Sequence, residues 1–219
     1  MQKRTPLLLI VLLLAGCASG AAKPPQPEPL PVTITLKHGD EPERQTQAQL
    51  ERLLRTYDVR PWLFTDKIVI ERDVIPHSHP VLTLSTQKEE NDDLQLSTFV
   101  HEQLHWFLES RPEDVEKAVA DLKTLFPQVP VGYPDGARNE YSSYLHLLVC
   151  TLEDDAMRRL LGESRARQVL ETLTTSHYRW IYRQVLERGG DLRGILAKHR
   201  LDPLARPTPA PAAPARSNP

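Results

Sequence analysis

The residues with the clearest chemical potential form the run His101-Glu102-Gln103-Leu104-His105. On a helix, residues four apart lie on the same face, so both imidazoles can reach one metal ion. Zinc accepts neutral imidazole nitrogens, and a neighbouring carboxylate can take a proton from zinc-bound water. We therefore expect His101 and His105 to bind one zinc ion and Glu102 to act as the general base in peptide hydrolysis.

A catalytic zinc usually has three protein ligands and a water molecule, so a third ligand must come from elsewhere in the chain. The helical pattern at residues 138–161 carries His146 and Glu153, which are seven apart and share one face. Glu153 is the predicted third ligand, because a carboxylate in an apolar stripe is costly unless it is paired or metal-bound. His146 is the alternative and would give a three-histidine site, and His177 is a further candidate.

The elements that would position these residues follow from hydrophobic periodicity and from the helix start and stop signals. Asp92 and Asp93 are the expected N-cap of the helix that carries the two histidines, and Pro112 starts the helix that follows it. The pattern predicts a helix-dominated α+β fold with a small N-terminal sheet and a C-terminal helical subdomain. The expected strands are residues 32–36, 67–75 and 81–85, and the other expected helices are residues 45–57, 112–126, 138–161, 163–188 and 191–200.

Strands followed by an H-E-x-x-H helix and then a helix with Glu153-x-x-Ala156 resemble the gluzincin branch of the zincin metallopeptidases. Asn139-Glu140 with Ser143 is also similar to the N-E-x-x-S run of thermolysin-type members, which makes Glu140 another candidate ligand. The metzincin pattern is excluded, because Leu108 and Arg111 stand where it needs Gly and His.

The gluzincin resemblance implies a compact zincin-like domain with a cleft above the active-site helix. A substrate peptide would pair with an edge strand, for which residues 81–85 are the expected element. A Tyr or His often stabilises the oxyanion in zincins, and His177, Tyr178 and Tyr182 are the candidates here. His77 and His79 lie between prolines and are interpreted as solvated turn residues.

The first residues read as a processing segment rather than as part of the fold. A basic start and a leucine-rich stretch end in Leu14-Ala15-Gly16-Cys17, which resembles a bacterial lipobox. That resemblance implies a signal peptide at residues 1–16 and a lipid on the Cys17 sulfur, with palmitate among the expected acyl chains. Ser19, rather than Asp, favours the outer membrane over the inner one.

Proline placement marks the flanks of the domain. Eleven of the twenty prolines lie in residues 24–31 and 203–219, which predicts a tether at residues 17–31 and a Pro/Ala-rich disordered tail at residues 203–219. The domain then spans residues 32–202. With Cys17 lipidated, Cys150 is the remaining thiol, and its apolar helical setting predicts a buried small side chain.

A formal net charge of −2, without a basic run, argues against nucleic acid as a partner. The expected partners are the membrane, through the lipid, and a peptide or protein substrate in the cell envelope. The leading hypothesis is a zinc-dependent envelope peptidase on the periplasmic side. The alternative is a non-catalytic zinc-binding envelope lipoprotein, for which Glu102 would have no role.

Overall fold

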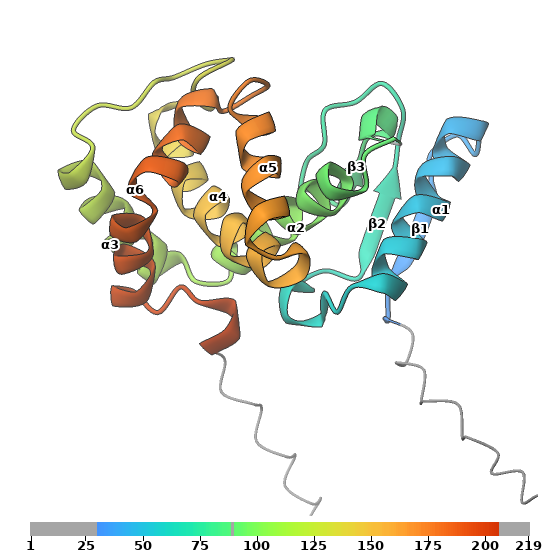
Figure 1. The fold of residues 1–219 in the computed structure, drawn as a ribbon, viewed down its shortest axis with the longest axis horizontal. Helices are drawn as coiled ribbons and strands as arrows, with labels where there is room; N and C mark the ends of the chain where they lie inside the picture. Colours follow the sequence, from blue (N-terminus) through green and yellow to red (C-terminus); the bar gives the residue numbers. More distant parts are fainter. Residues whose placement is uncertain (1–29, 89, 206–219) are drawn as a thin grey trace, which may run out of the picture.

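The computed structural model describes residues 30–88 and 90–205. They form a helix-dominated α+β fold, which confirms the predicted class: a small parallel sheet from the N-terminal part stands beside a larger group of helices (Figure 1). The predicted signal peptide, Cys17, most of the tether and residues 206–219 lie outside the described residues. None of the described helices combines the length and apolar character that crossing a membrane requires.

The sheet has the order β1-β2-β3, and both strand pairs are parallel. Its strands are β1 (Thr33–Leu36), β2 (Lys67–Ile70) and β3 (Leu82–Leu84). Helix α1 (Glu41–Thr56) and the short 3₁₀ turn η1 (Arg60–Trp62) connect β1 to β2, and α1 packs against both of these strands. The strand predicted at residues 67–75 stops at Ile70, because the chain turns away near Asp73, whose φ is +60°.

The free edge of β3 is already occupied at its centre. Thr83 N–H donates to His77 O over 2.8 Å, and His77 N–H donates to Thr83 O over 3.1 Å. In a parallel ladder alternate residues bond to the same neighbour, so Thr83 is the residue of β3 whose backbone groups point away from β2. The prediction that a peptide pairs with residues 81–85 is therefore wrong at Thr83, since the chain's own 75–79 segment takes that place.

Helix α2 (Asp92–Glu109) lies between the sheet and the C-terminal group of helices, and it contacts both β3 and α4 (Figure 1). Asn91, rather than Asp92 or Asp93, is its N-cap, and Asn91 Oδ1 accepts the Leu94 N–H over 3.0 Å. The two aspartates occupy the first turn, where the helix dipole favours negative charge. The Gln103 amide fixes the segment before β2, since it accepts from Phe64 N–H and bonds both backbone groups of Thr65.

The 22-residue helix α4 (Glu140–Leu161) is central to the helical part and packs against α2, α3 (Pro112–Leu125), α5 (Glu163–Leu173) and α6 (Arg179–Lys198). Asn139 caps its start, and Gly162, with φ +82°, ends it. The loop before α4 is held by Ser143, whose hydroxyl donates to Pro130 O and accepts from Ala137 N–H. Gly136 permits this fold of the loop, because a Cβ there would lie 2.0 Å from Pro130 O.

The helix predicted at residues 163–188 is wrong, because the structure divides it at residues 174–178. Thr174 and Thr175 turn their hydroxyls onto the carbonyls of Glu171 and Thr172, which competes with continuation of α5. Helix α6 then spans Arg179–Lys198 and consists of two helical parts that meet at a kink at Arg188, whose φ of −123° and ψ of 22° are non-helical. The predicted break near residue 188 and the helix predicted at residues 191–200 are thus confirmed, although the second part begins at the kink, before Gly189 and Gly190. Two more 3₁₀ turns are η2 (Thr86–Lys88) and η3 (Pro203–Ala205), and η3 falls in the predicted tail.

Candidate metal centre

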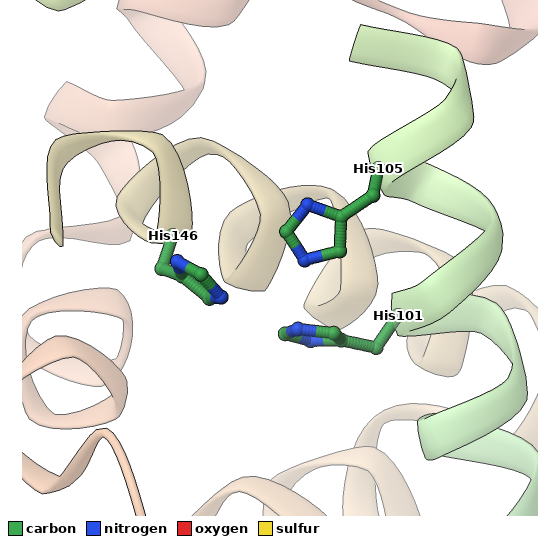
Figure 2. A group of neighbouring side chains, drawn as sticks. All are labelled: His101, His105 and His146. Carbon is green, nitrogen blue, oxygen red and sulfur yellow. The ribbon is translucent and has the colours of Figure 1, made fainter. Parts of the chain in front are cut away.

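Three histidines from two helices face one another between α2 and α4 (Figure 2). One ligand nitrogen from each of His101, His105 and His146 lies within 4.8 Å of the other two. The ring centroids are 5.1 Å apart for His101 and His105, 5.6 Å for His101 and His146, and 5.0 Å for His105 and His146. The predicted one-turn pair on α2 is thus joined by the alternative third ligand, His146.

Hydrogen bonds at Nδ1 of His101 and of His146 leave the other nitrogen of each of these two rings for the cluster. His146 Nδ1 lies 2.7 Å from Ser142 O, and His101 Nδ1 lies 2.9 Å from Glu153 Oε2. A carbonyl or carboxylate oxygen can only accept, so the Nδ1 atom of each ring carries the proton in these bonds. Nε2 is then the nitrogen that His146 offers to an ion, and the one that His101 offers once the ion displaces its second proton.

Burial keeps two of the three rings in the neutral form that a metal ligand needs. Loss of solvation, followed by the nearby positive charge of His101, lowers the pKa of His105 to about 2 and that of His146 to about 3. Burial also disfavours a charge on His101, but the carboxylate of Glu153 outweighs it, and the His101 pKa lies well above its usual range. The cluster therefore contains nitrogen donors with one buried anion beside them.

Glu102 is buried, with 7 % of its surface exposed, and lies one residue after the first histidine of the cluster. Burial raises the pKa of its carboxyl, and the charge of His101 partly offsets this. A raised carboxyl pKa suits a group that takes up a proton and later releases it. The structure thus buries Glu102 next to His101 on α2, close enough for the charge of that ring to act on its carboxyl.

Glu153, the predicted third ligand, lies on the Nδ1 side of His101. Its Oε2 accepts from His101 Nδ1–H and from the Tyr182 hydroxyl, each over 2.9 Å, and its Oε1 accepts from the Ser97 hydroxyl. Cys150 is fully buried, as predicted, and together with His101 and Glu153 forms a second group of potential ligand atoms within 4.8 Å of one another. Ser97 was not among the predicted residues, although its position four before His101 on α2 places it on the same helix face.

Tyr178 lies against the cluster at the start of α6. Its ring centroid is 4.2 Å from that of His146, and its ring stacks on His101 at 6.3 Å. The backbone of Tyr178 has φ +51°, a strained value for a non-glycine residue that here directs the side chain to the site. His177 contacts Tyr178 and Tyr182, and burial lowers its pKa to about 4, but it belongs to no metal-ligand group in the described residues.

The remaining candidates have other surroundings. Glu140 is exposed in the first turn of α4, and the preceding Asn139 caps that helix. His77 and His79 are exposed, as predicted, but His79 also stacks on Trp106 and contacts Glu109 over 2.6 Å. The group of His38, Asp40 and Glu43 could also hold an ion, but hydrogen bonds within the β1–α1 junction already engage Glu43.

Comparison with known proteins adds no relative: the chain matches no protein-family model, no curated protein and no solved structure. The assignment therefore rests on the residues themselves. Buried histidine, glutamate and cysteine side chains of α2 and α4 form a centre that could hold a metal ion.

Proposed function

We propose that the protein is a zinc-dependent peptidase of the cell envelope, with His101, His105 and His146 as the zinc ligands. The observation that carries the proposal is the convergence of three imidazole nitrogens, together with a buried carboxylate, Glu102, directly after the first of these histidines on α2. A purely structural metal centre has no use for that carboxylate, whereas hydrolysis needs a base at this position.

The donor set suits zinc in both chemistry and geometry. Imidazole nitrogens bind zinc at about 2.0–2.1 Å, so three of them around a tetrahedral ion lie about 3.4 Å apart. The observed group falls within 4.8 Å, so small side-chain rotations would close it around an ion. Three protein ligands leave a fourth position for water or substrate, as catalytic zinc sites do.

Bound zinc would supply Lewis acidity, polarising the substrate carbonyl and lowering the pKa of water. Glu102 would take the proton from the attacking water and deliver it to the departing amine. The raised pKa of its carboxyl makes Glu102 a stronger base for the first of these transfers. The Tyr178 ring lies against His146 at the cluster. Its hydroxyl would donate a hydrogen bond to the substrate carbonyl oxygen, which gains negative charge during the attack by water.

The resemblance to gluzincins extends to the order of the elements and the H-E-x-x-H helix, but the proposed ligand set departs from that branch. His146 replaces the glutamate that the branch uses as its third ligand. The lipobox at Leu14-Ala15-Gly16-Cys17 supports a lipid-anchored location facing the periplasm, with an envelope peptide or protein as substrate.

The test compares Glu102→Gln with the unaltered protein in zinc content and in cleavage of internally quenched peptides of mixed sequence. We expect about one zinc per chain in both proteins and a fall in kcat of about 10²–10⁴-fold in the variant, the usual contribution of a general base. Glu113→Gln removes an exposed carboxylate from α3 and serves as the matched control, with activity unchanged.

Two results would overturn the proposal. Purified protein that takes up no zinc would remove the metal centre. Zinc-loaded protein that cleaves none of the peptides, or cleaves them equally well after Glu102→Gln, would instead leave a zinc-binding envelope lipoprotein without catalysis.

A further inference from the structure

The Glu153 carboxylate is the most fully bonded buried anion in the metal centre, with 1 % of its surface exposed. Ser97 on α2 donates to one oxygen, and His101 on α2 and Tyr182 on α6 donate to the other. Two further helices thus orient a side chain that belongs to α4. The proposed hydrolysis uses neither Tyr182 nor Ser97, so this arrangement calls for a separate role.

The position of this carboxylate argues against direct coordination of an ion held by the three histidines. Glu153 bonds to His101 at Nδ1, and His105 and His146 each offer a nitrogen within 4.8 Å of a nitrogen of the same ring. Because Nδ1 is engaged by Glu153, Nε2 is the nitrogen left for the cluster. The two nitrogens of an imidazole direct their lone pairs away from each other. To become a ligand, Glu153 would have to leave His101, and Tyr182 would lose its buried acceptor.

We infer that Glu153 is a positioning residue that holds the His101 proton on Nδ1 and so presents Nε2 to the metal ion. Tyr182 and Ser97 in turn fix the carboxylate, so that three helices determine the orientation of one imidazole. This inference rests on the proposed three-histidine metal centre but not on peptide cleavage. It assigns Glu153 a different role from the glutamate of the gluzincin pattern.

A bound dication would also gain from the buried negative charge. An ion with three neutral imidazole ligands keeps its full positive charge in a site with little solvent. The anionic Glu153 lies one ring away and compensates part of that charge without occupying a coordination position. Outer carboxylates that accept from a ligand histidine typically contribute 10–100-fold to metal affinity.

The test measures zinc affinity by competition with a chromophoric chelator and coordination by zinc X-ray absorption. The Glu153→Gln protein should keep the histidine coordination of the unaltered protein, with affinity lower by about 10–100-fold. Tyr182→Phe should lower the affinity in the same direction by a smaller factor, because only one of the donors to Glu153 is lost. Histidine coordination retained at lower affinity is a result that general loss of packing would not give.

Asp154→Asn is the matched control, because Asp154 is the neighbouring buried carboxylate of α4 but bonds to Arg158 and Arg193 instead of the histidines. Its zinc affinity should equal that of the unaltered protein. His146→Ala, which removes a proposed ligand, serves as the reference for ligand loss. If Glu153→Gln loses an oxygen ligand in the absorption spectrum and loses zinc as completely as His146→Ala does, Glu153 is a ligand and the inference is wrong.

Sulfur scattering in the unaltered protein would also overturn the inference, since it would place the ion between His101, Cys150 and Glu153. Failure of the proposed function is separate. A protein that binds zinc through three histidines and cleaves no peptide would contradict the peptidase and leave the role of Glu153 intact.

Discussion

At the scale of single residues, Glu43 illustrates how a buried carboxylate fixes a junction of the backbone. Its side chain is fully buried and accepts from the backbone N–H groups of His38, Gly39 and Arg72 and from the His38 ring. Burial opposes the negative charge, but these hydrogen bonds outweigh it and lower the Glu43 pKa to about 2.

Glu43→Gln should therefore destabilise the protein by about 2 kcal/mol at pH 7, with solvent near the junction moderating the effect. A carboxyl with a lowered folded-state pKa stabilises the fold above the unfolded value of 4.5 and loses that contribution as pH falls toward 2. Urea unfolding between pH 7 and pH 3 should show the difference narrowing below pH 4.5. Glu41→Gln, an exposed change on the same helix, should have a much smaller effect, and a constant difference across this pH range would contradict the prediction.

Residue spacing could nominate the candidate ligands but could not choose among them. His146 and Glu153 are seven residues apart, so a common helix face was predictable. Seven residues also separate them by about 10 Å along the helix axis. Glu153 bonds to Nδ1 of His101, whereas the His146 ring lies 5.6 Å from the His101 ring between centroids. Whether His146 or Glu153 can reach a metal ion held by His101 depends on how far α4 is shifted along α2. The spacing of residues along the sequence does not contain that information.

At the scale of elements, the proposed zinc would join α2 to α4, since His101 and His105 come from one helix and His146 from the other. Free zinc at a hundred times its Kd should stabilise the fold by about 2.7 kcal/mol. In a domain of this size, that corresponds to a rise in Tm of about 5–10 °C. Thermal unfolding with and without a chelator should show the difference in the unaltered protein and lose it in His146→Ala.

His199→Ala is the control for this zinc effect, because His199 bonds to Asp121 and lies in no metal-ligand group of the described residues. His199→Ala should lower the Tm slightly both with zinc and with chelator, and the rise in Tm caused by zinc should be the same as in the unaltered protein. An equal Tm with and without chelator in the unaltered protein would show that no ion joins the two helices.

Elements with strong local signals were predicted best. Helix α3 begins at Pro112 and α4 ends before Gly162, because proline at a helix start and glycine at its end act through the backbone alone. The division between α5 and α6 was missed, since apolar spacing continues across residues 174–178 while their hydroxyls bond to the preceding helix. Closure of the β3 edge by His77 was also missed, because it depends on how a loop folds back in three dimensions.

At the scale of the whole molecule, the proposed envelope location depends on residues outside the described structure, namely the lipobox that ends at Cys17. A thioether-linked lipid places acyl chains in the bilayer, and each buried methylene contributes about 0.8 kcal/mol to membrane binding. Cys17→Ser removes the sulfur that would carry the lipid. The folded domain should be unaffected by this change, since the proposed zinc ligands all lie between residues 101 and 146.

We expect the unaltered protein to sediment with bacterial membranes and to yield, by mass spectrometry, an N-terminal peptide that begins with acylated Cys17. The Cys17→Ser protein should not yield the acylated peptide. It should either no longer sediment with membranes or keep its leader uncleaved, and its purified domain should still bind zinc. Cys150→Ser is the matched control: Cys150 is buried within α4, where no acyl chain could reach its sulfur, so membrane association should be unchanged. If Cys17→Ser leaves both membrane association and N-terminal processing as they are in the unaltered protein, the lipid anchor is wrong, and the zinc centre must be considered without an assigned compartment.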